Sequence, residues 1–434
     1  MSKTDYFAKL VLFKYSSVAF SMGSSILYSF FAANILGPEG YGPISYLLIF
    51  MASLPNIFGF GAIYDIVNVY AAKGLMRSVM SKIISLSLGA LLLLAVLSFA
   101  FSGMFSSAIQ NVDQVSFVLA LAVLVMVPFS LVLEGFFSGK KNFGKILKLT
   151  MLEKGIDLVG LLFFLLVLNQ GPLSMVYSKI ISATVIAVSY ALLFRKTSLE
   201  KKEIAHKEVK KFAISSLIMN LVKGWSVQAD VVFLMALLEP RALGLFYLLQ
   251  RLQAYVIDTP ANAIAEVVLP FLSEESSNKH KMESYTNLVL KFQFILNVGS
   301  VVIFLAIVPY VLYFFFPAYV GLTAVLPVFS IGLLFYFSDS LSKLAKSTNH
   351  NHMLTRQFAF RIVALVILAY LLIPPYGLLG AVIVFMLLRV MSSFYMLAEL
   401  RLAGFKLSFI PRLSDIRLFY RTSTRLMGRI YRRV

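Results

Sequence analysis

Residues 115–137 read VSFVLALAVLVMVPFSLVLEGFF, an apolar segment whose single charged residue is Glu134. A helix rises about 1.5 Å per residue, so this segment extends roughly 35 Å, which is enough to cross a hydrocarbon layer about 30 Å thick. The segment lacks the alternation of a barrel strand. Because backbone polar groups must be satisfied inside lipid, it is predicted to be a membrane-spanning α-helix.

Further apolar segments of the same kind occur throughout the chain. Hydrophobic residues make up 59% of 434 positions and charged residues 14%, a balance that a soluble protein of this length could not bury in one or two cores. The sequence therefore predicts an all-α polytopic membrane protein of about twelve transmembrane helices. The expected spans are 10–36, 44–68, 83–105, 115–137, 149–168, 174–194, 212–237, 244–271, 292–315, 323–341, 357–374 and 378–398.

Lysine and arginine residues are distributed unevenly between the loops that connect these spans. Alternate loops and the two termini hold 31 of the 39 Lys and Arg residues, the opposite loops hold only Arg241, and seven lie within spans. This is the pattern of the positive-inside rule, so both termini are expected in the cytoplasm and the membrane is expected to be the inner, cytoplasmic one. The formal charge of +19 then reflects topology, and no nucleic-acid partner is predicted.

The chain is expected to divide into two lobes of six helices each. The stretch LGPEGYG at 36–42 lines up with LEPRALG at 238–244, at an offset of 202 residues. Six helices per half give both halves the same orientation, so a duplication would create a pseudo-twofold axis along the membrane normal. The predicted lobes are 1–200 and 201–404.

Residues 405–434 are predicted to form a basic amphipathic tail in the cytoplasm. Within it Arg417, Arg421, Arg425 and Arg429 recur every four residues. This stripe is typical of a helix that binds anionic membrane lipids at the interface. The alternative is a solvated tail that only helps to fix the topology.

Four stretches of the chain resemble polysaccharide-unit flippases, the O-antigen flippase branch of the multidrug/oligosaccharidyl-lipid/polysaccharide (MOP) superfamily. They are LGPEGYG at 36–42, EGFFSGK at 134–140, Asp230 with Leu234 and GLFY at 244–247, and Leu269-Pro270 with Leu272-Ser273. The resemblance implies two six-helix lobes around a central cavity that opens alternately to each side of the membrane. It also implies a lipid-linked oligosaccharide as substrate, in which a sugar repeat unit is carried on a polyprenyl pyrophosphate. Polysaccharide polymerase machinery is a further candidate partner.

Ionisable residues within spans are costly, at about 2.5–3.5 kcal/mol each on insertion scales, so they are expected to face a cavity or a partner. Cations that face water are natural receptors for a pyrophosphate. The candidate substrate-binding residues are therefore Lys14, Lys179, Lys223, Arg251, Arg361 and Arg389.

Spacing along each helix predicts which of these cations are paired. Lys154–Asp157, Lys223–Asp230 and Arg251–Asp258 each share a helical face, and Asp230 and Asp258 are candidates for charge pairing or ion coupling. Lys14 and Lys179 have no acid within two turns of their own helices. Arg361 and Arg389 also lack a nearby acid in sequence. An acid on another helix is the alternative partner for each.

The preferred interpretation is a flippase that moves lipid-linked oligosaccharide from the cytoplasmic to the outer face. One alternative is a cation-coupled multidrug exporter of the same fold that uses Asp230 or Asp258 as its ion site. Another is a membrane-embedded glycosyltransferase or polymerase, although the outer loops are short for catalysis. No enzyme activity, cofactor or metal site is predicted, because the GKK at 139–141 lacks the glycine and hydroxyl spacing of a phosphate loop and the histidines lie in cytoplasmic loops.

The topology can be tested by cysteine labelling, since the chain has no native cysteine. Gln110→Cys and Gln170→Cys should react with a membrane-impermeant thiol reagent added outside. Cysteines placed within 195–211 or 342–356 should react only after the membrane is opened. Labelling of these inner loops in intact cells, with protection at both outer sites, would contradict the predicted orientation.

Overall fold

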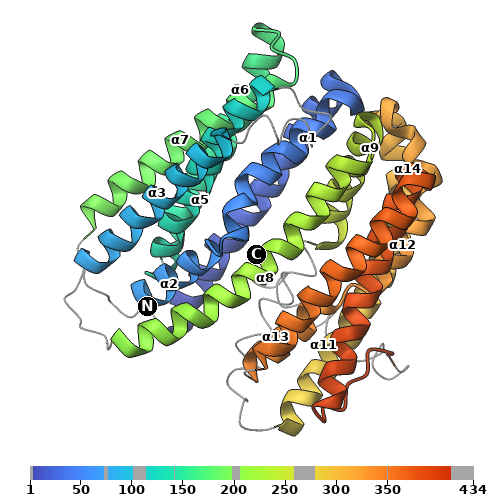
Figure 1. Cartoon of the computed structure of the whole chain (residues 1–434). Helices are drawn as coiled ribbons and strands as arrows, with labels where there is room; N and C mark the ends of the chain where they lie inside the picture. The colour runs from blue at the N-terminus through green and yellow to red at the C-terminus, as the bar shows by residue number, and fades with distance from the viewer. Residues whose placement is uncertain are drawn as a thin grey trace. The chain divides into compact units, whose positions relative to one another are not determined.

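The computed structural model describes residues 3–72, 77–100, 114–140, 142–197, 206–258, 279–348 and 350–411, and its secondary structure there is helical throughout (Figure 1). This confirms the all-α fold class. Backbone contacts divide the chain into unit 1, Met1–Leu248, and unit 2, Leu249–Val434. The two six-helix lobes expected at 1–200 and 201–404 stay a prediction, and the tail from residue 412 onward lies outside the described residues.

Unit 1 is built around α5, which packs against α1, α2, α3 and α7. Its interior holds a cluster of buried side chains that includes Val132, Phe136 and Tyr190. Apolar residues recur on the faces that meet there, so burial of these faces holds the helices together. The helices of this unit are α1 Lys3–Ile57, α2 Gly61–Ala72, α3 Arg77–Ala100, α5 Gln114–Gly139, α6 Phe143–Leu162 with η1 Phe163–Val167, α7 Leu173–Lys196, α8 His206–Leu237 and the first part of α9 Pro240–Gln253.

Unit 2 contains a second buried cluster, in which Phe337, Leu341 and Met396 lie together. The long helix α14 packs against α12 and α13, and α11 packs against α12 and η3. The elements of this unit are the end of α9, η2 Ala254–Asp258, α11 Lys279–Phe315, η3 Pro317–Ala324, α12 Leu326–Leu334, α13 Ser338–Ser347 and α14 Asn351–Leu402.

Seven helices of the described chain are long and apolar enough to cross a membrane, or eight if η3 and α12 form one bent span. Two of the seven contain a kink that separates two expected spans. Gly37 has φ 67° inside α1, and Gly377 has φ 52° inside α14. Positive φ is readily accessible to glycine, so both turns between spans are made without a loop. The chain is a multi-pass membrane protein, and the count of about twelve spans stays a prediction.

The tenth expected span, 323–341, is not one continuous helix. The axes of η3 and α12 differ by 64°, and α12 ends at Leu334. Gln293 of α11 donates to the carbonyl of Tyr336 at 2.8 Å, and Asn297 donates to the same carbonyl at 3.1 Å. These amides satisfy backbone groups that the break leaves open, as a membrane interior requires.

The second expected span, 44–68, is also interrupted. α1 ends at Ile57 and α2 begins at Gly61, with a turn in which the Phe58 and Phe60 amides donate to the carbonyl of Pro55. Gly59 supplies the positive φ of 78° that this turn uses. The break changes the direction of the chain at the point where α8 packs against it.

Helices α1 and α9 cross with their backbones in direct contact at two glycines. A Cβ added to Gly42 would lie 2.3 Å from the Cα of Gly244, and one added to Gly244 would lie 1.9 Å from the carbonyl oxygen of Pro38. Gly42 and Gly244 are the equivalent positions of the proposed internal repeat. The internal repeat and its pseudo-twofold axis stay a prediction.

We expect Gly244→Ala to destabilise the protein, because its methyl group would meet backbone that cannot move aside. The expected loss is about 1–3 kcal/mol, the range for overpacked positions, and it would appear as a lower midpoint of thermal unfolding in detergent. Gly23→Ala is the matched control, because no atom lies within 4 Å of its added Cβ. Equal stability of the two variants would contradict the close crossing.

Candidate functional site

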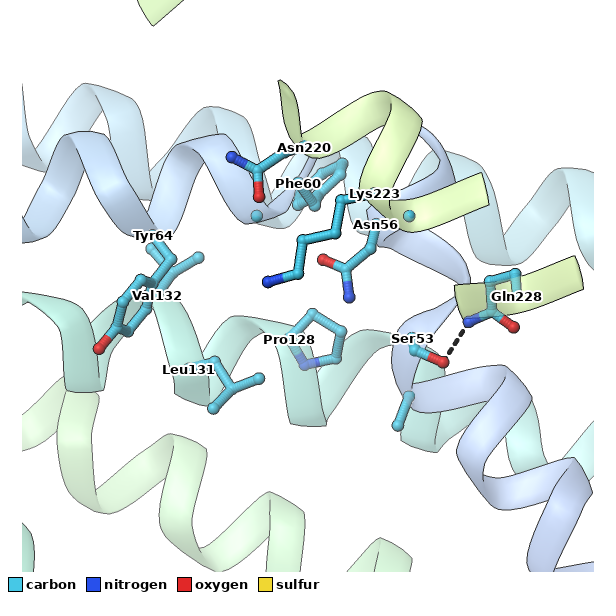
Figure 2. Close-up of a pocket in the computed structure, with 13 residues that line it drawn as sticks. Ser53, Asn56, Phe60, Tyr64, Pro128, Leu131, Val132, Asn220, Lys223 and Gln228 are labelled. Carbon is cyan, nitrogen blue, oxygen red and sulfur yellow. Dashed lines mark hydrogen bonds between the residues drawn. The ribbon is translucent and has the colours of Figure 1, made fainter. Parts of the chain in front are cut away.

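A cavity of about 470 Å³ lies in unit 1 where α1 ends and α2 begins, with α5 and α8 forming its other walls (Figure 2). Its apolar surface includes Phe60, Pro128, Leu131 and Val132. A small number of polar groups in a largely apolar cavity of this size is typical of a ligand site. The polar lining residues are Ser53, Asn56, Tyr64, Asn220, Lys223 and Gln228.

The close approach of α8 to the α1–α2 break forms this cavity. A Cβ added to Gly224 would lie 2.1 Å from the carbonyl oxygen of Asn56, and one added to Gly61 would lie 2.4 Å from Oδ1 of Asn220. At Gly224 only a residue without a side chain permits this spacing, whereas a side chain at Gly61 would displace that of Asn220. The glycines therefore allow Asn56, Asn220 and Lys223 to lie close together.

Lys223 is the charged residue among the described lining residues of the cavity. Its side chain extends from α8 into the cavity, toward Tyr64 and away from Gln228 (Figure 2). The expected ion pair with Asp230 is not found in the described part of the chain. Seven residues separate the two along α8, which is roughly 10.5 Å of helix axis and too far for direct contact.

Gln228 contributes a buried amide to the same cavity. Its side chain is 1% exposed, and its Nε2 donates to Oγ of Ser53. Its Oε1 has no hydrogen-bond partner among the described residues. A buried acceptor without a donor is unfavourable by about 1–3 kcal/mol, so this oxygen is suited to accept from a bound hydroxyl or a water molecule.

Lys179 lies outside the cavity lining and forms ion pairs with two carboxylates of α6. Its Nζ is 3.4 Å from Oε1 of Glu153 and 3.4 Å from Oδ2 of Asp157. Lys154 pairs instead with Glu153, at 3.4 Å, and Ser182 donates to Asp157. The expected Lys154–Asp157 pair is therefore wrong, because α7 inserts a competing cation that no spacing within α6 reveals.

Arg389 is held between two aromatic rings in unit 2. Its guanidinium carbon lies 4.7 Å from the centre of the Tyr336 ring and 4.5 Å from that of Phe385. Tyr336 belongs to the break between α12 and α13. Cation–π contacts with both rings stabilise a cation at this position.

The remaining candidate residues are spread over both units. Asp230 lies in α8 of unit 1, and Arg251 and Arg361 are half-buried in α9 and α14 of unit 2. Lys14 lies in α1 and Asp258 ends η2, but their side chains are outside the described ones. A substrate-binding role for all six cations stays a prediction.

The structure adds three amides, Asn56, Asn220 and Gln228, that the sequence analysis did not single out. Candidate residues were taken from the ionisable residues within spans, and uncharged amides were not considered. The recurrence of glycine near them, at Gly59, Gly61 and Gly224, is the signal that could have drawn attention to a close helix contact.

A family model described as "Polysaccharide biosynthesis protein" matches residues 31–319 of the chain. No curated protein matches significantly.

Solved structures of MOP-superfamily transporters share the fold. An inward-facing multidrug resistance MATE family transporter is 16% identical with a TM-score of 0.71, over 90% of this chain and 98% of that chain. A MOP superfamily transporter from Pyrococcus furiosus is 18% identical with a TM-score of 0.66, over 90% and 95%.

The lipid II flippase MurJ, in an inward closed conformation, is 14% identical with a TM-score of 0.71, over 91% of this chain and 87% of that chain. At these identities the likeness shows the fold. This fold agrees with the one that the resemblance implied.

The ion cluster around Lys179 predicts a stability effect. Lys179→Met would leave two carboxylates without their shared cation and should destabilise the protein by about 3–5 kcal/mol, measured by thermal unfolding in detergent. Adding Asp157→Asn should restore part of this loss. Lys196→Met, at the exposed end of the same helix, is the control. A fully stable Lys179→Met that has lost transport would instead indicate a substrate ligand.

Proposed function

Because the chain belongs to the polysaccharide biosynthesis protein family, we propose that it is an alternating-access flippase for polyprenyl-pyrophosphate-linked oligosaccharide repeat units. It would move them from the cytoplasmic to the outer face of the inner membrane. The family assignment supports a substrate from polysaccharide synthesis, and the fold is shared with transporters and a flippase. A flippase binds the polar head of its lipid and carries it past the hydrocarbon core.

The single observation that carries this proposal is the ammonium of Lys223 in the cavity of unit 1. A cation within a membrane-spanning helix is unfavourable unless it faces water or an anionic partner. A pyrophosphate supplies such a partner, and lysine binds phosphate groups as a point charge. The cavity therefore matches the anionic part of the proposed substrate.

The uncharged lining of the cavity matches the sugar part of the same molecule. Asn56 and Asn220 offer amide donors and acceptors to sugar hydroxyls, and the buried amide of Gln228 lies beside them. Phe60 and Tyr64 supply aromatic surface for the apolar faces of a sugar ring. This combination suits a hydroxyl-rich ligand better than an apolar one.

A cation-coupled multidrug exporter is the second candidate, because a multidrug resistance MATE transporter shares the fold. Such an exporter would place an acid where a cationic drug or a coupling ion binds. The described lining of the cavity contains a lysine and no carboxylate. An anionic substrate is therefore the better match.

Flipping of lipid-linked oligosaccharide into the outer leaflet of proteoliposomes tests the proposal. Lys223→Gln should lower the rate about ten- to a hundredfold, because a hydrogen bond to a charged group contributes about 1.5–3 kcal/mol. Lys223→Arg should retain part of the activity, since it keeps the charge. Lys148→Gln, which removes an exposed cation of α6, should leave the rate unchanged.

Rates are compared per molecule of folded protein. If Lys223→Gln flips the lipid-linked oligosaccharide at the wild-type rate, Lys223 is not the receptor for the head group. Cation-dependent drug efflux by the wild type, without flipping of the lipid-linked sugar, would favour the exporter.

A further inference from the structure

A second, apolar groove of about 430 Å³ lies in unit 1 next to the polar cavity. One wall is the end of α1 and the turn after it, with Leu54, Phe58 and Phe60. The other wall is a stripe of α3 that includes Ala90, Leu94 and Leu97. These α3 positions are three and four residues apart, so they share one helical face.

The groove and the cavity share one dividing segment. Along residues 53–60, Ser53 and Asn56 line the cavity, whereas Leu54 and Phe58 line the groove. Phe60 lines both spaces. The same turn therefore separates a site that contains an ammonium from a site that contains only hydrocarbon and one serine, Ser98.

We propose that this groove holds the first part of the polyprenyl chain while the pyrophosphate lies at Lys223. The proposal rests on the function proposed above and assigns the tail of the same substrate. A ligand with an anionic head and a hydrocarbon tail needs adjoining sites of these two kinds. Linking the two contacts in one molecule raises the affinity beyond that of either alone.

The groove is also open to the surroundings of the helix bundle. Leu93 and Leu97 at its edge are 61% and 47% exposed, and in a membrane such side chains meet lipid. A tail in the groove therefore stays continuous with the hydrocarbon phase. Ordinary membrane lipid is the competing occupant of the groove. Its binding would not depend on Lys223, whereas binding of the polyprenyl pyrophosphate would.

The test compares a ligand with a tail and one without, on full-length protein in lipid nanodiscs. The probes are radiolabelled long-chain polyprenyl pyrophosphate and radiolabelled methyl pyrophosphate. Ala90→Trp fills the groove from an exposed position, and Leu94→Trp fills it from a half-buried one. Leu92→Trp is the matched control, since Leu92 is 50% exposed on the same helix and does not line the groove.

Ala90→Trp should weaken binding of the polyprenyl probe about tenfold and leave binding of methyl pyrophosphate within about twofold, since only the tail contact is lost. Leu92→Trp should change neither. Partition of the tail into the bilayer affects every variant equally, so the difference between these two variants isolates the groove.

Three results would overturn the proposal. If both groove variants bind the polyprenyl probe like Leu92→Trp while methyl pyrophosphate still binds, the tail lies elsewhere and the proposed function stands. If excess phosphatidylglycerol removes the effect of Ala90→Trp, the groove is an ordinary lipid surface. If the wild type binds neither probe, the pyrophosphate function itself fails, and the groove proposal fails with it.

Discussion

The cavity of unit 1 depends on the absence of side chains at the contact between α8 and the α1–α2 break. With any Cβ at Gly224, α8 would have to move away from the backbone of Asn56, and Asn220 and Lys223 would move with it. A Cβ at Gly61 would displace the side chain of Asn220. The turn after α1 adds the positive φ of Gly59 and the shared acceptor at Pro55. Glycine at these positions thus permits both a close helix contact and a small polar space beside it.

A comparable principle operates in unit 2, where a helix is broken and its open backbone groups are satisfied by α11. Gln293 also accepts from Ser340 at 2.6 Å, so one amide binds both the break and the first turn of α13. Arg389 packs over Tyr336 at the same place. A polar interior of this kind is stable in a membrane only while every donor and acceptor stays matched, which explains why the break and the amides of α11 belong together.

Much of this architecture could be predicted from the sequence, because the membrane imposes simple rules on composition. The span expected at 115–137 is α5, Gln114–Gly139, and the span expected at 174–194 is α7, Leu173–Lys196. The partners of the charges could not be predicted equally well. Lys179 finds its acids on another helix, and helix packing is not encoded in the spacing of one segment. The amides of the cavity went unnoticed because only ionisable residues within the spans were taken as candidates.

The cluster on α6 and α7 has an electrical consequence. Lys154 and Lys179 carry two positive charges, and Glu153 and Asp157 carry two negative ones, so the four sum to zero. A membrane potential acts on net charge, at about 2.3 kcal/mol per elementary charge for each 100 mV. A rigid displacement of these four residues across the field would therefore require almost no electrical work. The ion-paired cluster itself adds no sensitivity to the membrane potential, although it places four charges inside the helix bundle.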